Sequence, residues 1–429
     1  MLPDVLIIGA GLAGATAAVE LTRAGHSIAV VEGRERVGGR GFSRNAAECG
    51  EMLDLGGSWI TPWQTGIRRL AASHGITLRP RHPVTARRWF RDGGLYEDGP
   101  ASPEDRGSHE AAIARMATDA AMLKLGRDAD EKGRPLRGVS LAEYLDRLRA
   151  IASTRAVVGA WWAVSGNGDK ARVPASEFLT SLNYGNGTPD GMCEVWAESL
   201  SGGVSTLVQR MLAGTAAPLD LGRRVPRIST RIEGLAVTFA DGSERMAKTV
   251  LVATGLNPMR DIRFDPPLSA AKRKALSVGH LGRAMKVWAK VRGVPAGTLA
   301  TGGLDGIEWM FAERATADGA TMLVGFGVDA GESPIDGADA ARKAVKRFFP
   351  NAQILAVDWH DWIKDPFSQG TWVASAVGAE DGFTAAIWRR EGRIAFASRD
   401  IASSENGWFE AAVISGREAA SELMKIVKT

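Results

Sequence analysis

Residues 5–32 read VLIIGAGLAGATAAVELTRAGHSIAVVE, and they determine how the remainder of the chain is interpreted. An apolar run (5–8) is followed by a glycine turn, GAGLAG, and then by small and apolar residues with a helical period. A second apolar run (28–31) ends on an acid, Glu32. Strand, glycine turn, helix, strand and acid in this order are typical of a dinucleotide-binding βαβ unit.

Each glycine of the turn has its own physical role in such a unit. Gly9 permits a tight turn, Gly11 lets backbone N–H groups approach a pyrophosphate, and Gly14 lets the helix pack close to the strand. The helix N-terminus presents unpaired N–H groups and a positive dipole end to the phosphates. Glu32 is placed to accept hydrogen bonds from a ribose 2′-OH, which disfavours NADP and leaves FAD and NAD.

The composition is that of a globular protein with more than one packed unit. The chain has 429 residues, of which 45% are apolar and 24% charged, enough for two or three units. Its 53 basic and 49 acidic residues give a net charge of +4, which is too balanced to indicate nucleic-acid binding. The six histidines show no metal-ligand spacing, so no metal site is predicted.

Nothing in the sequence indicates export or insertion into a membrane. The first strand follows Met1 almost directly, without a signal peptide, and no window is apolar enough to span a bilayer. Cys49 and Cys193 are the only cysteines, which gives no disulfide framework and favours a reducing compartment. We therefore predict a cytoplasmic protein without a membrane partner.

Local patterns outside the opening stretch predict further elements. Ser140, with Glu143 three residues later, forms a capping box that predicts a helix over 141–150. The segment 245–253 predicts a single strand, and the alternation at 285–291 predicts another.

Two further glycine motifs follow the opening stretch closely. Residues 32–40 read EGRERVGGR, in which paired glycines and an arginine can approach and clamp a phosphate. Residues 54–59 read DLGGSW, and this glycine pair lets the backbone pass close to a flat ligand. With the opening stretch, these motifs resemble the signature of the flavin-dependent amine oxidases, the monoamine oxidase family, and in particular the bacterial nicotine and 6-hydroxynicotine oxidases.

The resemblance covers nearly the whole chain and implies its architecture. It predicts an α/β fold with a two-dinucleotide-binding, Rossmann-like FAD domain and a second, mixed α+β substrate domain. The FAD domain is expected from residues 1–75, 202–256 and 366–429, and the substrate domain from residues 76–201 and 257–365.

The resemblance also implies FAD as the cofactor and places its contacts. Val225 corresponds to the adenine contact, Asp400 to the ribityl contact, and Val413 to the turn whose backbone meets the flavin ring. Some members carry a cysteine bonded to the flavin where this chain has Thr371, so non-covalent FAD is predicted. The predicted cofactor residues are Gly9, Gly11, Gly14, Glu32, Arg34, Gly39, Arg40, Gly56, Gly57, Ser58, Trp59, Val225, Thr254, Asp400 and Val413.

Three residues are predicted to carry the catalytic role. The resemblance implies that Lys286, within the alternating segment 285–291, holds a water at the flavin N5. Trp372 and Trp408 match the two walls of an aromatic cage in front of the flavin, where many members have tyrosine.

Three others are candidates for the substrate pocket, each with a structural alternative. Asn167 offers an amide to a bound substrate, but a turn residue with left-handed backbone fits the pattern at least as well. Phe311 and Phe326 come from strand-like stretches and are candidate pocket walls, although plain core is the default interpretation.

The predicted reaction is the oxidation of a small apolar amine to an imine by hydride transfer to the flavin N5. The amine is expected to be cyclic or to bear an aromatic group, as in alkaloid degradation. Hydrolysis of the imine and reoxidation of the flavin by oxygen, with release of hydrogen peroxide, would complete the cycle.

Three alternatives stay open. They are a carotenoid or porphyrinogen desaturase, an amine dehydrogenase with an acceptor other than oxygen, and a flavin module that recognises a protein tail. Lys286 and the paired tryptophans argue against the first, and the lack of an added partner-binding domain argues against the last. The oligomeric state is open too, with a homodimer as one candidate.

Overall fold

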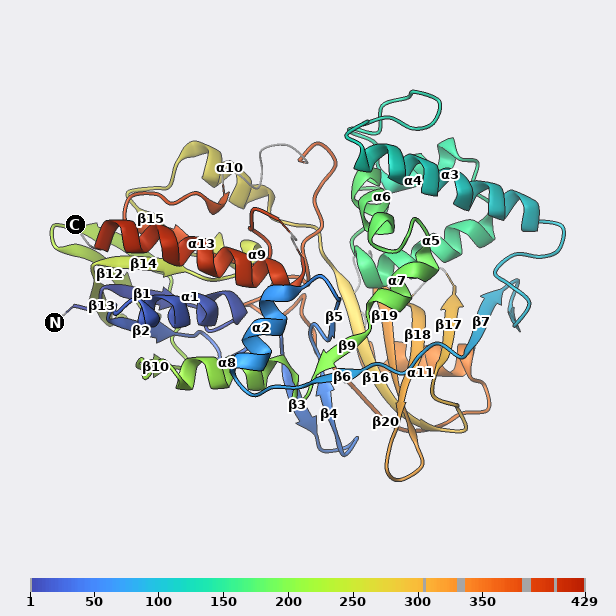
Figure 1. The fold of residues 1–429 in the computed structure, drawn as a ribbon, viewed down its shortest axis with the longest axis horizontal. Helices are drawn as coiled ribbons and strands as arrows, with labels where there is room; N and C mark the ends of the chain where they lie inside the picture. Colours follow the sequence, from blue (N-terminus) through green and yellow to red (C-terminus); the bar gives the residue numbers. More distant parts are fainter. Residues whose placement is uncertain (1, 304–305, 330–335, 380–386, 405–406, 428–429) are drawn as a thin grey trace.

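The computed structural model describes residues 2–303, 306–329, 336–379, 387–404 and 407–427. They form two regions that lie side by side (Figure 1). The region that holds both ends of the chain is built around a parallel sheet, and the other around a larger mixed sheet covered by helices. The predicted α/β fold class is confirmed.

The parallel sheet begins with the opening stretch of the sequence. β1 and β2 pair in parallel, from Val5 opposite Ile28 to Ile8 opposite Val31. All neighbouring strands are parallel, in the order β10-β2-β1-β14-β21. The bounds are β1 (Val5–Ile8), β2 (Ile28–Val31), β10 (Leu219–Asp220), β14 (Thr249–Val252) and β21 (Ile394–Phe396). The strand–turn–helix–strand prediction for residues 5–32 is confirmed.

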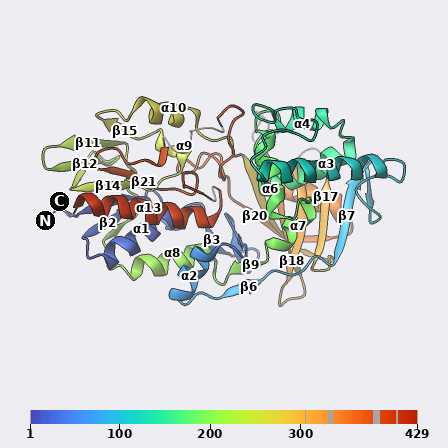
Figure 2. The ribbon, with the colours of Figure 1, turned by 45° about the horizontal axis from the view of Figure 1, so that its top comes forward.

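Helices cover one face of this sheet. α1 (Leu12–Arg23) follows the glycine turn and packs along the closing helix, α13 (Phe409–Val427), as Figure 2 shows. The two helices come close because small residues meet: a side chain at Gly416 would lie 2.5 Å from the carbonyl oxygen of Ala13. The other helices of this layer are α2 (Thr65–Ser73) and α8 (Gly203–Ala213).

The opposite face of the sheet packs against a four-stranded layer. Val5 and Ile7 lie in the core with the helices, whereas Leu6 and Ile8 lie in the core beneath the layer, as alternation along a strand requires. The layer has the order β13-β12-β11-β15. Its elements are β11 (Arg227–Arg231), β12 (Gly234–Thr238), β13 (Glu244–Ala247) and β15 (Arg263–Asp265), with α9 (Leu256–Met259) and α10 (Ala270–Val278) beside it.

The prediction of a single strand over 245–253 is wrong. β13 pairs antiparallel with β12, and β14 begins two residues later and pairs parallel with β1 in a different sheet. Lys248 lies between the two strands, and its backbone N–H donates to the carbonyl oxygen of Pro3. The apolar pattern continues through this change of partner, so periodicity alone does not reveal the break.

The second region is built on a seven-stranded sheet in the order β20-β16-β19-β18-β17-β7-β8. β17 and β7 are parallel, and the other neighbours are antiparallel. The bounds are β7 (Ala86–Arg91), β8 (Gly94–Tyr96), β16 (Ala284–Arg292), β17 (Thr298–Gly302), β18 (Ile307–Ala315), β19 (Thr321–Val328) and β20 (Gln353–Trp359). The sheet joins segments 76–201 and 257–365, although β15 and α10 of the latter pack with the first region. The predicted division into two domains stays a prediction, which this pairing supports.

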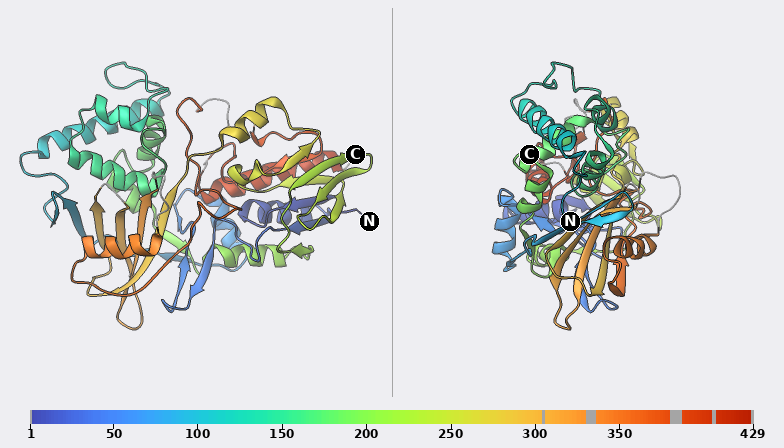
Figure 3. Two further views of the ribbon diagram at one scale, coloured as in Figure 1. Left: turned by 180° about the vertical axis from the view of Figure 1, so that it is seen from behind. Right: turned by 90° about the vertical axis from the view of Figure 1, so that its right-hand side faces the viewer.

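Helices cover both faces of the seven-stranded sheet. α11 (Gly337–Phe348) lies on the opposite face from the other helices, as Figure 3 shows. The others are α3 (Arg106–Lys124), α4 (Leu141–Arg147), α5 (Ala152–Ser165), α6 (Ala175–Tyr184) and α7 (Pro189–Val195). The predicted capping box is confirmed. Ser140 Oγ accepts from the Glu143 N–H, and the Glu143 carboxylate accepts from the Ser140 N–H. α4 ends three residues earlier than predicted, since Arg149 adopts a positive φ of 54°.

Two small sheets bring the DLGGSW segment between the regions. Asp54 ends one strand and Trp59 begins another, so the glycine pair forms the turn between them. The strands are β3 (Ser43–Ala46), β4 (Glu51–Asp54), β5 (Trp59–Ile60), β6 (Leu78–Pro80) and β9 (Glu198–Leu200).

Candidate functional site

A groove lies over the carboxyl ends of β1, β2 and β14, where dinucleotides bind in folds of this kind. Gly9 has a φ of 110°, and a side chain there would lie 2.6 Å from the Ala253 carbonyl oxygen. A side chain at Gly14 would lie 2.0 Å from the Gly9 carbonyl oxygen, so Gly14 permits the strand–helix contact and does not line the groove. Gly11 lines the groove and leaves its backbone accessible.

Glu32 closes one side of the groove. Its buried carboxylate accepts from the backbone N–H of Ala10 at 2.8 Å and of Arg34 at 2.9 Å. These bonds fix the carboxylate at the end of β2, where the family contact with a ribose is predicted.

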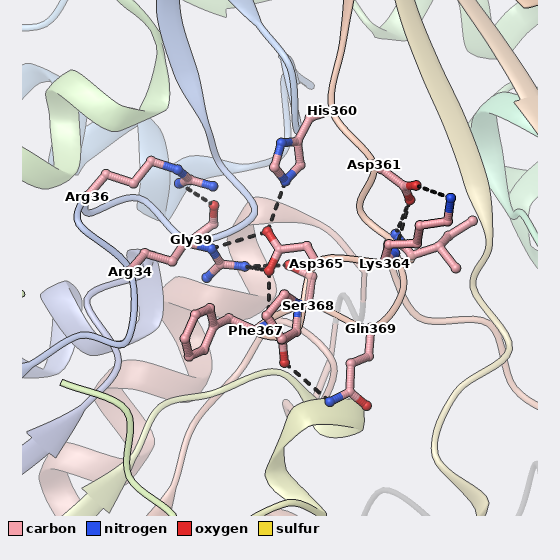
Figure 4. A network of polar contacts seen from close by, with 12 residues as sticks. Arg34, Arg36, Gly39, His360, Asp361, Lys364, Asp365, Phe367, Ser368 and Gln369 are labelled. Carbon is pink, nitrogen blue, oxygen red and sulfur yellow. Dashed lines mark hydrogen bonds and ion pairs between the residues drawn. The ribbon is translucent and has the colours of Figure 1, made fainter. Parts of the chain in front are cut away.

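Arg34 ties the end of β2 to a segment more than 300 residues later (Figure 4). Its guanidinium donates to Asp365 Oδ1 at 2.9 Å and to Ser368 Oγ at 2.7 Å. Burial would raise the pKa of Asp365, but the hydrogen bond from His360 and the charge of Arg34 lower it to about 2. The loop 360–369 is therefore held against the groove by a charged pair.

Arg40 links two further segments across the groove by an ion pair and a hydrogen bond. Its guanidinium donates to Asp400 Oδ2 at 2.7 Å and to the Thr371 carbonyl oxygen at 2.5 Å. Asp400 also accepts from the Leu256 N–H at 3.0 Å. Burial opposes ionisation, but the charge of Arg40 keeps the pKa of Asp400 well below its usual range.

The groove fits a dinucleotide such as FAD. Thr254 Oγ1 and Asp400 Oδ1 are buried without a hydrogen-bond partner in the described part of the chain. A hydroxyl and a carboxylate oxygen of this kind need partners, and the ribose, ribityl and phosphate groups of FAD can supply them. Gly39 and Val225 line the same groove, whereas Asp400 lies just behind its lining.

A second cavity of about 390 Å³ lies between the two regions. It is lined by the predicted residues Gly56, Gly57, Ser58, Trp59, Lys286, Phe326, Trp372 and Trp408, which come from widely separated segments. The turn of the DLGGSW segment, strand β16 and the segment after β20 thus converge on one space.

Lys286 projects from β16 into a cage of oxygen atoms. Its ammonium donates to the carbonyl oxygens of Asp54 at 2.6 Å and Gly56 at 2.8 Å, and to Ser58 Oγ. Burial lowers the pKa of Lys286 to about 8, against the opposing charges of Asp54 and Glu313. A lysine of this kind can hold or exchange a proton near neutral pH.

The two predicted cage tryptophans line the same cavity and make ring contacts with different neighbours. Trp372 meets Phe326 edge-on, with ring centroids 6.3 Å apart at 69°. Trp408 meets Tyr184 edge-on at 6.1 Å and 63°, and Trp63 at 6.3 Å and 71°. Each indole is thus held by aromatic neighbours, of which Phe326 and Tyr184 line the same cavity.

The model of a known family, the flavin containing amine oxidoreductases, matches residues 12–424. The chain belongs to this family. The (S)-6-hydroxynicotine oxidase of Paenarthrobacter nicotinovorans is 28% identical over 98% of this chain and 99% of that protein. The pseudooxynicotine dehydrogenase of a Pseudomonas species is 27% identical over 99% of this chain and 87% of that protein. The structure of cyclohexylamine oxidase from Brevibacterium oxydans shares the fold, with a TM-score of 0.82 at 21% identity and full coverage of both chains.

The predicted family, cofactor and reaction type are therefore confirmed. As a flavin containing amine oxidoreductase, the protein uses FAD and oxidises an amine to an imine. The desaturase alternative is not favoured, because the relatives named above act on amines. No described helix of this oxidoreductase is long and apolar enough to cross a bilayer. Within the same described ranges, His, Cys, Asp and Glu side chains form no group of three that could hold a metal ion.

Three further predicted site residues line neither cavity of this oxidoreductase, and for Asn167 and Phe311 this agrees with the structural alternative. Asn167 does not line the cavity; with a φ of 62°, it accepts from Thr371 Oγ1 at 3.0 Å and donates to the Trp372 carbonyl oxygen at 3.1 Å. Phe311 is fully buried, with its ring 6.1 Å from that of Trp309, and does not line the cavity. Val413 is buried in the helix-side core, outside the lining of the groove.

The sequence analysis missed one wall of the substrate cavity. Five residues of α6 line it, at spacings that place them on a single helix face: Ser176, Glu177, Thr180, Ser181 and Tyr184. Trp162 and Trp196 complete the aromatic lining. The helical spacing of the α6 residues was a usable signal, whereas nothing in the sequence shows which face of α6 meets the cavity.

Trp196 also belongs to a stack of three indoles. Trp59 lies parallel to Trp196 at 5.3 Å and 16°, and Trp196 lies parallel to Trp161 at 5.3 Å and 11°. Glu313 accepts from the Trp59 indole N–H at 3.1 Å and fixes the cavity end of the stack.

Proposed function

We propose that this oxidoreductase acts on a small, largely apolar amine that is cyclic or bears an aromatic ring. The single observation that carries the proposal is the aromatic lining of the cavity, made of Trp59, Trp162, Tyr184, Trp196, Phe326, Trp372 and Trp408. Ring faces bind flat apolar groups and attract the cationic form of an amine. A volume of about 390 Å³ is in the range of small-ligand sites.

The relatives support a nicotine-type alkaloid intermediate as the substrate class. Two of them are named for 6-hydroxynicotine and pseudooxynicotine, and each aligns over nearly all of this chain. Both names describe an amine joined to an aromatic ring, which suits a cavity lined by indoles.

We assign the chemical roles as follows. Bound FAD supplies the acceptor for the hydride that leaves the carbon next to the nitrogen. Trp372 and Trp408 orient that carbon by confining the amine between aromatic walls. Lys286 exchanges a proton near neutral pH, which its pKa of about 8 allows. Its three N–H groups go to three protein oxygen atoms, so it positions a water when the water replaces one of these partners. Residues of the groove, Glu32 and Arg34 among them, hold the adenosine and pyrophosphate end.

The experiment that tests the substrate class is anaerobic bleaching of the bound flavin by a panel of amines. We expect cyclic and aromatic-bearing amines to bleach the flavin faster than linear aliphatic amines or polyamines. Trp408→Ala should remove this preference while FAD stays bound, because it opens the aromatic lining. Equal rates across the panel, or fastest bleaching by a polyamine, would reject the proposed class.

We further propose oxygen as the electron acceptor, with hydrogen peroxide as product. One relative is named an oxidase and another a dehydrogenase, so the assay must compare oxygen uptake with reduction of an artificial acceptor. Turnover that consumes the artificial acceptor but no oxygen would assign a dehydrogenase instead.

We also propose a cytoplasmic location and no nucleic-acid partner, on the cysteine usage and the balanced charge. Cell fractionation tests the location. Light scattering of the purified protein tests the homodimer that the sequence left open.

A further inference from the structure

Arg399 lies where the dinucleotide groove and the substrate cavity meet. Among the described residues, only Arg399 and Phe409 line both the dinucleotide groove and the substrate cavity. These two residues therefore mark where the two spaces meet. FAD spans the groove, and its reactive ring must reach the substrate, so this junction is where the isoalloxazine belongs.

The Arg399 side chain is held at the junction but incompletely paired. Its guanidinium donates to the Gly407 carbonyl oxygen and lies 6.0 Å from the centre of the Phe409 ring. Its Nε is buried without a hydrogen-bond partner within the described ranges. Burial, reinforced by the charge of Arg40, lowers the pKa of Arg399 to about 9, so the guanidinium is still charged at neutral pH.

Among the described residues, the charge of Arg399 is not matched by a carboxylate of its own. Asp400 is the neighbouring carboxylate, but one of its oxygens is taken by Arg40 at 2.7 Å and its other oxygen is unpaired. His280, also near, has its pKa lowered to about 4 by burial and is neutral at pH 7. Asp400 thus pairs with Arg40, and within the described ranges Arg399 has no carboxylate bonded to its guanidinium. A buried excess charge is costly unless a bound group compensates it.

Amine oxidation supplies such a compensating charge. A hydride carries two electrons and one proton, so its transfer turns the neutral amine into a cationic iminium and adds one negative charge to the cofactor. We propose that Arg399 stabilises this negative charge on the reduced flavin, and thereby raises the reduction potential of the bound cofactor. Arg399 is then a redox-tuning residue of this chain and not only a structural link to Gly407.

The test measures the midpoint potential of the bound flavin in the holoenzyme, by reductive titration against a reference dye. Arg399→Gln removes the charge and keeps hydrogen-bond donors, so reduction should become harder by roughly tenfold in the equilibrium constant, about 30 mV for two electrons. Arg399→Lys keeps the charge and should restore most of the potential. Arg263→Gln removes the same charge from the exposed surface of β15 and should leave the potential unchanged.

Each outcome decides the proposal. A lower potential in Arg399→Gln, with rescue by Arg399→Lys and FAD retained in both, supports it. An unchanged potential with FAD retained overturns it. Failure of Arg399→Gln to retain oxidised FAD also overturns it, because Arg399 would then hold the cofactor regardless of its redox state. A lower melting temperature with an unchanged potential likewise overturns it, since loss of the bond to Gly407 accounts for that result.

Discussion

At the scale of single residues, the oxygen cage around Lys286 shows what the sequence could and could not reveal. The resemblance predicted the position of Lys286, and the structure adds the two carbonyl oxygens and the Ser58 hydroxyl that hold its ammonium. Asn167 and Phe311 lie where their structural alternatives put them, in a left-handed turn and in the core, and the sequence could not choose between the two interpretations. Alternation or turn propensity locates a residue on an element but does not show what the facing element places opposite it.

Lys286→Met should slow amine oxidation or flavin reoxidation by roughly a hundredfold, the size typical of losing a positioned proton-handling group. FAD should stay bound, because Lys286 lines the substrate cavity and not the dinucleotide groove. Stopped-flow measurement of the two half-reactions separates the steps. Lys290→Met is the matched control: it removes a lysine from the same strand, paired instead with Cys49 and Asp318. Equal losses in both variants would reject the assigned role.

The buried ammonium of Lys286 should also make the free energy of unfolding depend on pH. Burial lowers its pKa from 10.5 to about 8, so between these values the unfolded chain binds more protons than the folded one. The contribution of Lys286 is therefore unfavourable below pH 8 and is relieved as the pH rises toward 10.5. The unfavourable contribution of Lys286 to the free energy of unfolding decreases by about 1.4 kcal/mol per pH unit in that window.

The measurement is the free energy of unfolding of wild type and Lys286→Met at several pH values. Other titrating groups cancel in the difference between the two proteins. Relative to Lys286→Met, the wild type should gain stability from pH 8 to pH 10. A difference that does not change with pH would show that Lys286 keeps an ordinary pKa in the fold.

At the scale of elements, the sequence predicted best where local chemistry alone sets the outcome. The glycine turn between β1 and α1, and the capping box of α4, depend on residues a few positions apart. The break between β13 and β14 depends on distant partners, β12 and β1, and the apolar pattern runs through it without change. The contribution of α6 to the cavity likewise depends on the strands and loops that face it.

Ser140→Ala should destabilise the protein by about 1 kcal/mol, the usual cost of losing an N-terminal cap. Ser140 accepts from the Glu143 N–H, and the change leaves that N–H without its partner. Chemical denaturation measures the loss, and the rate of amine oxidation should not change, since Ser140 lines neither cavity. Ser277→Ala, on the exposed face of α10, should cost markedly less. Equal losses of stability in Ser140→Ala and Ser277→Ala would show that the Ser140 cap does not stabilise the protein.

At the scale of the whole molecule, the site is assembled by ties between segments far apart in the sequence. Arg34 meets Asp365, Arg40 meets Asp400, and Lys286 meets the turn at Gly56. The order of elements and the cofactor followed from motifs that match the family. The convergence of these segments on two adjoining cavities could not be predicted, because it depends on how two regions of the chain pack.

The bound FAD should be released by acid precipitation of the whole protein, leaving a colourless pellet. The reason is Thr371, which stands where some family members have a cysteine bonded to the flavin. Its hydroxyl already donates to Asn167 Oδ1 and accepts from the Ala284 N–H, so it belongs to the scaffold. The flavin absorbance of the supernatant and of the redissolved pellet shows where the FAD goes. Yellow colour that stays with the pellet after unfolding would mean attachment at another residue.

The three parallel indoles of Trp59, Trp196 and Trp161 give this oxidoreductase an optical property of its own. Transitions of rings stacked about 5 Å apart couple, so the near-ultraviolet circular dichroism should contain an exciton couplet. Because Trp59 borders the flavin-facing cavity, excitation of the stack should pass to bound flavin and quench indole emission. Tryptophan fluorescence thus becomes a direct gauge of cofactor occupancy, readable without adding substrate.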